Sequence, residues 1–168
     1  MMTPTQRDET AEEIAQHQVC TLHIGGEQFA LPLTDIVEVT SSVQLRDYPL
    51  SPAHIGGLMQ YRGEVVAAVC LRTLLGMPRY SRTESSVILT GTRGLFALLV
   101  DKIGEVLSVT TASFESIPAT VETQRQVLLA GTYKLNHGLL SLLDARKLEP
   151  SALRMHSSPG HRVGVTIQ

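Results

Sequence analysis

The sequence predicts an all-β fold with antiparallel sheets and only short helical turns. Short apolar runs recur along the chain, and turns that contain Gly, Pro or Asn separate them. We count roughly ten such runs at a spacing of about 8–12 residues, which is typical of sandwiches and barrels. No helical crossover connects them, so we expect antiparallel pairing.

Length and composition indicate one compact unit, or two small fused ones. The chain has 168 residues, of which 43% are hydrophobic, and this is enough for a real core. Cys20 and Cys70 both lie among apolar neighbours. We therefore expect free, buried thiols in a reducing compartment.

The N-terminal third begins with a polar tail over residues 1–17. A capping-box pattern at residues 10–13 predicts either a short helix over residues 11–17 or a frayed tail. Alternating apolar residues over 18–24 predict a half-buried strand, and an extended segment follows over 29–33. Thr34 and Asp35 then predict a helical turn over 36–39.

The next segment contains the clearest hairpin. Residues 43–48 predict a strand that Pro49 ends. Two apolar arms, 58–61 and 64–71, surround Arg62-Gly63, where Gly suits a positive φ. The second arm is apolar almost throughout, which favours a strand buried on both faces.

A Pro-, Ser- and Arg-containing loop over 76–84 follows, and we predict a boundary between subdomains there. Strands over 87–89 and 95–100 then flank the turn Gly91-Thr92-Arg93-Gly94. Further strands are expected over 106–109 and 114–117.

The last part of the domain is predicted to close with a third hairpin. Residues 119–127 are ambiguous between helix and loop, whereas 128–135 and 139–143 pair around Asn136-His137-Gly138. Asp144 is expected to cap a final helical turn that ends at Leu148. Residues 149–168 are predicted to form a mobile tail, which leaves 18–148 as the domain.

Charge and hydropathy argue against nucleic acid and membrane insertion. The formal charge is −2 and the chain has no Trp, so phosphate contacts and base stacking have few candidate residues. The longest apolar run, 65–71, is far shorter than the ~20 residues of a membrane helix. The polar start lacks the features of a secretory signal, so we expect a cytoplasmic protein.

No motif indicates catalysis or a metal. His17, Cys20 and His23 are spaced like metal ligands only on a helix, because a strand places Cys20 on the face opposite to the histidines. Nucleophile elbows, phosphate loops and dinucleotide fingerprints are missing from the sequence. We predict no enzyme, no cofactor and no metal site, although a triad of scattered residues would leave no signature.

Arg62 is the candidate recognition residue at the tip of the first hairpin. A charged side chain on a turn held by apolar arms suits partner recognition. The alternative is a solvated turn residue paired with Glu64. For Leu33, Ile36 and Val39, each considered alone, a core position is the better interpretation.

Four ordered blocks resemble the CheW family of chemotaxis coupling proteins, and together they cover about residues 18–148. The blocks are Gly25-x-Glu27-x-Phe29-x-Leu31 with Ile36-x-Glu38-Val39; Ile55-x-Gly57-x-x-x-x-Arg62-Gly63 with Leu71-Arg72; Leu99-Val100-Asp101-x-Ile103-x-x-Val106-Leu107; and Leu128-x-x-Gly131 with Leu140-x-x-Leu143-Asp144.

The resemblance implies two five-stranded SH3-like β-barrels that share a hydrophobic core. It also implies a non-enzymatic adaptor between methyl-accepting chemoreceptors, bound at their cytoplasmic tips, and the regulatory domain of a CheA-type histidine kinase. Such a protein stays in the cytoplasm and is recruited to membrane receptor arrays.

Site residues transfer by position from the same resemblance. Leu33, Ile36, Val39 and Val100 are expected to line the groove that accepts the receptor tip. Glu38, Gly57, Arg62 and Val106 are expected at or beside the receptor- or kinase-binding surfaces.

Three positions depart from the family pattern within the first hairpin. Gln60 stands where the family usually has Asn, and Ala67 and Cys70 stand where it has Pro and Asp. The missing Asp removes a cap before Leu71-Arg72, which typically costs ~1 kcal/mol unless Thr73 or another group replaces it. These changes suggest a pathway other than flagellar motility. The alternative function is a small β-barrel module that binds protein or nucleic acid outside chemosensory signalling.

Overall fold

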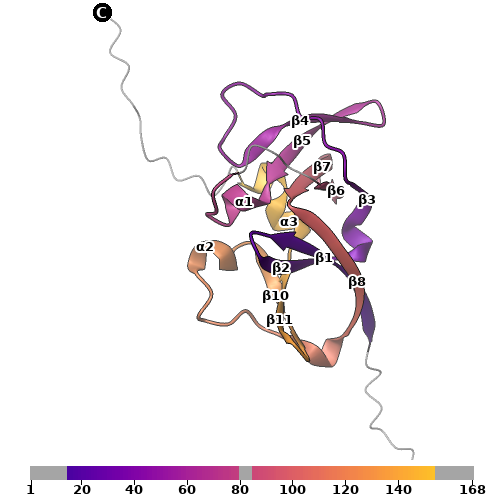
Figure 1. The fold of residues 1–168 in the computed structure, drawn as a ribbon, viewed down its shortest axis with the longest axis vertical. Coiled ribbons are helices and arrows are strands. Elements are labelled where there is room, and N and C mark those ends of the chain that lie inside the picture. Colours follow the sequence, from indigo (N-terminus) through magenta and orange to yellow (C-terminus); the bar gives the residue numbers. More distant parts are fainter. Residues whose placement is uncertain (1–14, 80–84, 154–168) are drawn as a thin grey trace, which may run out of the picture.

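The computed structural model describes residues 15–79 and 85–153, which form two β-sheets packed against each other (Figure 1). Predictions that concern residues 1–14, 80–84 and 154–168 lie outside the described residues. Within the described residues, no helix has both the length and the apolar character that a membrane crossing requires.

The first sheet has six strands in the spatial order β8-β1-β2-β11-β10-β9. Its strands are β1 (Gln16–Ile24), β2 (Glu27–Pro32), β8 (Lys102–Thr110), β9 (Phe114–Glu115), β10 (Leu129–Leu135) and β11 (Gly138–Leu143). The second sheet has five strands in the order β3-β6-β7-β5-β4. These are β3 (Ile36–Thr40), β4 (Ile55–Tyr61), β5 (Glu64–Cys70), β6 (Ser85–Gly91) and β7 (Gly94–Val100).

Short helical turns connect the strands, as the sequence predicts. They are the 3₁₀ helices η1 (Leu33–Asp35) and η2 (Thr111–Ser113) and the α-helical turns α1 (Leu71–Leu74), α2 (Thr123–Gln126), α3 (Ala145–Leu148) and α4 (Pro150–Leu153). The all-β prediction is confirmed. No ladder joins β3 to β4 or β8 to β9 in the described residues, so each sheet stays an open barrel-like sheet.

The five-stranded sheet is an insertion into the six-stranded one. The chain builds β1 and β2 first, leaves through η1 to form β3 to β7, and returns at Asp101 to form β8 to β11. The subdomain boundary predicted over 76–84 falls between α1 and β6, and the strands on either side of it, β5 and β6, belong to the same sheet. It therefore does not separate the two sheets.

The prediction of purely antiparallel sheets is wrong at two places. β5 pairs with β7 in parallel, and β2 pairs with β11 in parallel. Neither pair consists of strands adjacent in the sequence, so no local crossover signals the pairing. In each case a strand from one hairpin lies beside a strand from another hairpin.

Three apolar clusters form the core. The largest contains residues of both sheets, among them Leu22, Leu31, Val69, Phe96 and Leu98. One smaller cluster lies within the five-stranded sheet around Ala68 and Leu99, and another lies within the six-stranded sheet around Ala30 and Leu140. Each sheet thus curls over its own apolar cluster, and the two sheets share the central one.

Strands at the centre are buried on both faces. In β5, Val69 faces the shared cluster, whereas Ala68 and Cys70 face the cluster of the five-stranded sheet. This confirms the prediction made from the continuous apolar run. β1 was predicted to be half-buried, but Cys20 and Val19 contribute to different clusters on its two faces. Both cysteines are free and buried, as expected.

The three predicted hairpins are confirmed, and they differ in how their turns are made. At the β4–β5 turn Arg62 and Gly63 both have positive φ values, 47° and 82°. This combination is typical of the type I′ turn that suits strand twist. Gly94 and Gly138 have positive φ at the other two turns.

Three local predictions fail near the chain start and in the β3–β4 connection. Residues 16 and 17 belong to β1 and not to a helix. The helical turn expected over 36–39 lies at η1 instead, because the β-branched residues of β3 gain a ladder with β6. Residues 43–48 form only one bridge, between Arg46 and Leu58, and their apolar side chains pack without a ladder.

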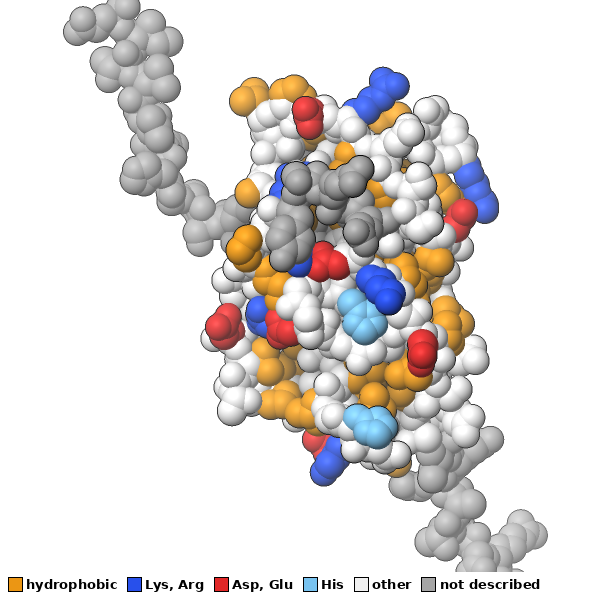
Figure 2. Space-filling model, viewed as in Figure 1, with side chains coloured by type: hydrophobic (Ala, Val, Ile, Leu, Met, Phe, Trp, Pro, Cys, Tyr) orange, Lys and Arg blue, Asp and Glu red, His pale blue; other side chains and the backbone are white. Residues whose placement is uncertain are grey.

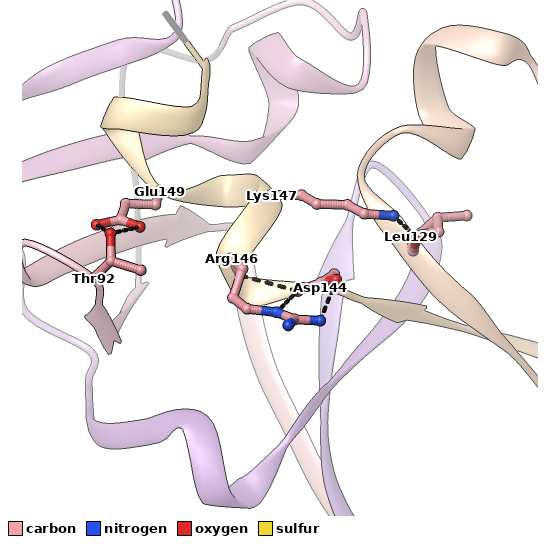
Figure 3. A network of polar contacts seen from close by, with 6 residues as sticks. All are labelled: Thr92, Leu129, Asp144, Arg146, Lys147 and Glu149. Carbon is pink, nitrogen blue, oxygen red and sulfur yellow. Dashed lines mark hydrogen bonds and ion pairs between the residues drawn. The ribbon is translucent and has the colours of Figure 1, made fainter. Parts of the chain in front are cut away.

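Residues 149–153 were assigned to a mobile tail, but they are fixed to the core. Leu153 of α4 belongs to the shared apolar cluster. Glu149 is only 5% exposed and accepts hydrogen bonds from the Thr92 hydroxyl (2.9 and 3.0 Å) and the Arg93 N–H (3.0 Å), both in the β6–β7 turn (Figure 3). Burial tends to raise the pKa of Glu149, but these bonds, together with one from Ser151, lower it overall.

The preceding turn, α3, is held to the other sheet. Asp144 accepts from the Arg146 N–H (3.0 Å), which confirms the predicted cap, and Lys147 donates to the Leu129 carbonyl of β10 (2.8 Å; Figure 3). The C-terminal turns thus connect the β6–β7 turn of one sheet with β10 of the other.

The return of the chain between the sheets is held by an ion pair. Arg72 of α1 donates from Nε and Nη2 to the two carboxylate oxygens of Asp101, at 2.6 Å each. Its Nη1 donates to the Pro78 carbonyl at 3.0 Å, and the Gly25 N–H of the β1–β2 turn donates to Asp101 at 2.8 Å. The Arg72 side chain is only 8% exposed. One carboxylate therefore connects α1, the β1–β2 turn and the crossing between sheets.

We expect Asp101→Asn to lower the free energy of unfolding by about 2 kcal/mol near neutral pH, because the buried Arg72 loses its carboxylate partner. The bonds from Arg72, more than that from Gly25, hold the pKa of Asp101 below its ordinary value. Such a group stabilises the fold above the unfolded pKa of about 3.9, and this contribution is lost as pH falls through the lower folded pKa.

Urea titrations at a series of pH values measure this effect. The difference between the wild-type protein and Asp101→Asn should shrink as the pH falls below about 4. A difference that stays constant down to the acid limit would contradict the ion pair as its source.

Glu149→Ala is expected to lower the free energy of unfolding by about 2 kcal/mol. The Thr92 hydroxyl and the Arg93 N–H both donate to the Glu149 carboxylate, and the substitution removes this acceptor. Denaturant melts measure the change. Glu122→Ala is the matched control, since that side chain is 79% exposed and should change stability by less than about 0.5 kcal/mol. Equal effects of the two substitutions would show that the hydrogen bonds to Glu149 do not stabilise the domain.

Candidate functional site

Several apolar residues lie on the edge strand β3 and in the turn before it. Val37 and Val39 are exposed, at 43% and 44%, whereas Leu33 and Ile36 are half-buried against the shared cluster. A bulge between Ile36 and Glu38 in the ladder with β6 places Val37 outside the regular pairing. The predicted Leu33, Ile36 and Val39 thus keep apolar surface available next to the junction of the sheets.

A hollow beside η1 extends this surface onto the six-stranded sheet. It is lined by Gln16, His17, Gln18, Val19, Pro32, Leu33, Thr34, Ser108 and Tyr133. Leu33 therefore lies in the same hollow as Ser108 of β8. Val106, two residues earlier on this edge strand, is 52% exposed. This group, Leu33, Ile36, Val37, Val39 and Val106, is called the apolar strip below.

Val100 does not belong to this surface. It is 2% exposed and lies in the shared cluster at the end of β7. The prediction that its side chain lines an open groove is therefore wrong for this structure. Its neighbour Asp101 forms the ion pair described above, so this position supports the groove from within.

Gly57 is also a structural residue and not an exposed one. It is buried in β4 with a φ of +148°, and a Cβ built there would lie 2.7 Å from the Arg46 carbonyl oxygen. The missing side chain allows the close approach that forms the Arg46–Leu58 bridge. Gly57 therefore shapes the surface without offering a side chain to a partner.

A charged cluster lies at the tip of the β4–β5 hairpin. Arg62 Nη2 donates to Glu38 Oε2 at 3.1 Å, and the Tyr61 hydroxyl donates to the same oxygen at 2.5 Å. The Arg62 guanidinium also lies 5.2 Å from the centre of the Tyr61 ring. The alternative partner predicted from sequence, Glu64, is wrong, because Arg62 pairs with Glu38 on another strand.

Electrostatics in this cluster favour a preformed arrangement. The hydrogen bond to Glu38 raises the pKa of Tyr61 above its ordinary value, because the bond stabilises the protonated phenol. The Arg62 side chain remains 73% exposed and that of Glu38 42% exposed. The guanidinium is thus oriented by two neighbours while most of it stays available to a partner.

Gln60 lies in a wide hollow beside this hairpin. Its lining comes from the 41–54 connection and from both hairpin strands: Ser42, Val43, Gln44, Leu45, Arg46, Asp47, Leu58, Met59, Gln60, Arg62, Gly63 and Val65. Ala67 lines a smaller hollow near Glu149. Cys70 is buried at the start of α1 and forms no side-chain cap, which confirms that the cap is lost.

The spacing of His17, Cys20 and His23 does not produce a site. All three lie on β1, where Cys20 faces the shared cluster. Burial raises the pKa of the Cys20 thiol, whereas a metal-ligand cysteine is deprotonated. In residues 15–79 and 85–153, no three His, Cys, Asp or Glu side chains are grouped as metal ligands.

Val37 and Tyr61 also belong to these surfaces, although no sequence pattern singled them out. Val37 was hidden by the helical turn predicted over residues 36–39, and a period-two pattern would have marked it. Tyr61 precedes Arg62 in the hairpin, but only the tertiary structure brings Glu38 to it. On the face of the molecule drawn in Figure 2, hydrophobic patches are interspersed with acidic and basic side chains, so the described residues in view form no large surface of one charge sign.

Comparison with known proteins gives one consistent result. The family model described as a CheW-like domain matches residues 18–152. The chemotaxis protein CheW of Bacillus subtilis is 25% identical over 138 residues, covering 81% of this chain and 88% of that protein. The chemotaxis protein CheW of Klebsiella aerogenes is 24% identical over 140 residues, covering 82% and 84%.

The fold has a solved counterpart. The crystal structure of the scaffolding protein TtCheW from Thermoanaerobacter tengcongensis superposes with a TM-score of 0.72 at 20% identity. The match covers 80% of this chain and 92% of that one. The arrangement of two SH3-like, barrel-like sheets is therefore shared.

We expect Gly57→Ala to lower the free energy of unfolding by roughly 2 kcal/mol, because its Cβ would press against the Arg46 carbonyl at a disfavoured φ. Thermal or urea melts measure this. Gln60→Ala, on the same strand at an exposed position, is the control and should be nearly neutral. If Gly57→Ala kept full stability, the structural role given to this glycine would be wrong.

Proposed function

The chain belongs to the CheW-like family, and from this membership we propose that it is a non-catalytic chemosensory scaffold that bridges chemoreceptors and a CheA-type histidine kinase. Its relatives carry the name of chemotaxis proteins, and the solved neighbour is a scaffolding protein. The proposal concerns the two partners and the surfaces that bind them.

One observation carries the proposal: two chemically different surfaces lie on one rigid body. The apolar strip borders the junction of the sheets, whereas the Glu38–Tyr61–Arg62 cluster joins β3 to the tip of the β4–β5 hairpin, so the two surfaces adjoin at β3. A shared core and the Arg72–Asp101 ion pair fix these surfaces relative to each other. A scaffold that binds two proteins at once needs such a fixed arrangement.

The apolar strip suits the cytoplasmic tip of a methyl-accepting chemoreceptor. A helical hairpin presents apolar side chains at helical spacing, and these can pack along a groove with Leu33 and Ile36 at its base. Val37, Val39 and Val106 would be covered on binding. Most of the binding free energy would come from the apolar surface area that these contacts remove from water.

The hairpin cluster suits the regulatory domain of the kinase. Arg62 is mostly exposed but held by Glu38 and Tyr61, so little side-chain entropy is lost when it binds. Arginines of this kind are common energetic centres of interfaces. The protein would act in the cytoplasm and reach membrane receptor arrays through its partners.

We expect Arg62→Ala to weaken kinase binding by about tenfold or more, while stability changes by less than about 1 kcal/mol, because the ion pair is exposed. Isothermal titration with the purified kinase regulatory domain measures the affinity. Arg93→Ala is the matched control, since Arg93 is an exposed arginine on another hairpin turn.

Val39→Asp should weaken binding to a receptor-tip fragment and leave kinase binding unchanged, because a carboxylate would be buried in an apolar contact. Pull-down with both purified partners tests each surface separately. If the wild-type protein binds neither folded partner, the proposed function is wrong.

A further inference from the structure

The hollow beside η1 lies where β2 leaves the six-stranded sheet. β2 ends at Pro32, opposite Val19, and the chain continues into η1. Residues 16–18 of β1 therefore pair with β8 on one side, and no described strand pairs with them on the other. The hollow has a volume of about 720 Å³, which lies within the usual range of ligand pockets.

Tyr133 of β10 lines this hollow, and the described residues provide no hydrogen-bond partner for its hydroxyl. The residue is only 6% exposed, and its ring packs against that of Phe114 with the ring centres 5.1 Å apart. Burial raises the pKa of Tyr133, and no hydrogen bond contributes to the shift. The hydroxyl oxygen is not sealed inside the core. A buried tyrosine usually has a hydrogen-bond partner, so this hydroxyl is positioned to bind a group that enters the hollow.

The lining of the hollow favours an uncharged polar group. No Lys, Arg, Asp or Glu is among the described residues that line it. A charged group that entered would lose hydration without an opposite charge beside it, which is costly. A carboxamide is uncharged and has both a donor and an acceptor. It can therefore bond to the Tyr133 hydroxyl and to the edge of residues 16–18 that no strand covers.

The hollow adjoins the apolar strip. Leu33 belongs to both. Ser108, which also lines the hollow, follows Val106 by two residues in a regular part of the β1–β8 ladder, so their side chains lie on the same face of β8. Arg62 lines a different hollow, beside the β4–β5 hairpin. A partner that covers the strip therefore lies next to Tyr133.

We propose that the hollow is a specificity pocket for the partner bound at the apolar strip, in which the Tyr133 hydroxyl forms a hydrogen bond with an asparagine or glutamine side chain of that partner. The inference rests on the proposed function, under which this partner is the cytoplasmic tip of a chemoreceptor. Apolar contacts along the strip supply most of the affinity. The pocket discriminates between receptor tips, because a side chain that leaves the enclosed hydroxyl unpaired binds less well.

Tyr133→Phe tests the pocket, because it removes the hydroxyl and keeps the ring beside Phe114. We expect affinity for a purified receptor-tip fragment to fall about three- to tenfold in isothermal titration, with binding to the kinase regulatory domain unchanged. The midpoint of thermal unfolding should not fall, because no described residue loses a hydrogen-bond partner. Tyr48→Phe is the matched control, since Tyr48 is 48% exposed and lies outside the hollow. It should leave both affinities unchanged.

A double-mutant cycle identifies the group that enters the pocket. Each Asn and Gln of the receptor-tip fragment is changed to Ala and titrated with the wild-type protein and with Tyr133→Phe. One of these changes should weaken binding to the wild-type protein and have no further effect on Tyr133→Phe. Full receptor affinity of Tyr133→Phe, or coupling to no Asn or Gln, would overturn the pocket and leave the proposed function standing. Failure of the wild-type protein to bind the tip would instead refute the proposed function.

Discussion

The ion pair between Arg72 and Asp101 is the constraint on which the arrangement of the two sheets depends. A sheet inserted into another sheet must be held against it where the chain returns. Asp101 lies on the return and contacts both α1 and the β1–β2 turn. Because the guanidinium is nearly buried and bonded in two places, the geometry of the junction has little freedom. The orientation of β3 and β8, the edge strands that carry the apolar strip, follows from this junction.

The strands next to the junction of the sheets are buried, whereas the exposed apolar residues lie at edges and turns. The central strands are buried on both faces and form three contiguous apolar clusters. Exposed apolar residues occur mainly at edges and turns, among them Val37 and Val39 on β3, Val106 on β8 and Leu50 in the 41–54 connection. Arg62 and Leu50, both in the left-handed region of φ, lie in turns, and the side chain of Leu50 is fully exposed. Recognition is thus placed on edges and turns, and the rigid interior fixes their separation.

Local features of the fold could be predicted well because their causes are local. Turn residues such as Gly63 and Gly138 mark the hairpins, and Asp144 caps α3 through a bond within three residues. The failures have equally specific causes. The β3 segment follows a capping pattern, yet pairing with β6 outweighs it. The packing of Leu153 and the bonds of Glu149 depend on the β6–β7 turn, about 60 residues away, so the C-terminal turns looked like a tail.

The sequence by itself determined the strand-rich class, the hairpins, the free buried cysteines and the ordered blocks that mark the family. Only the tertiary structure decided the parallel pairs, the partner of Arg62, the burial of Val100 and Gly57, and the exposure of Leu50. The physical reason is the separation along the chain over which each interaction acts. Turn geometry and period-two patterning act between neighbours, whereas pairing between distant strands depends on how the whole chain packs, and it is this packing that selects which apolar residues stay exposed.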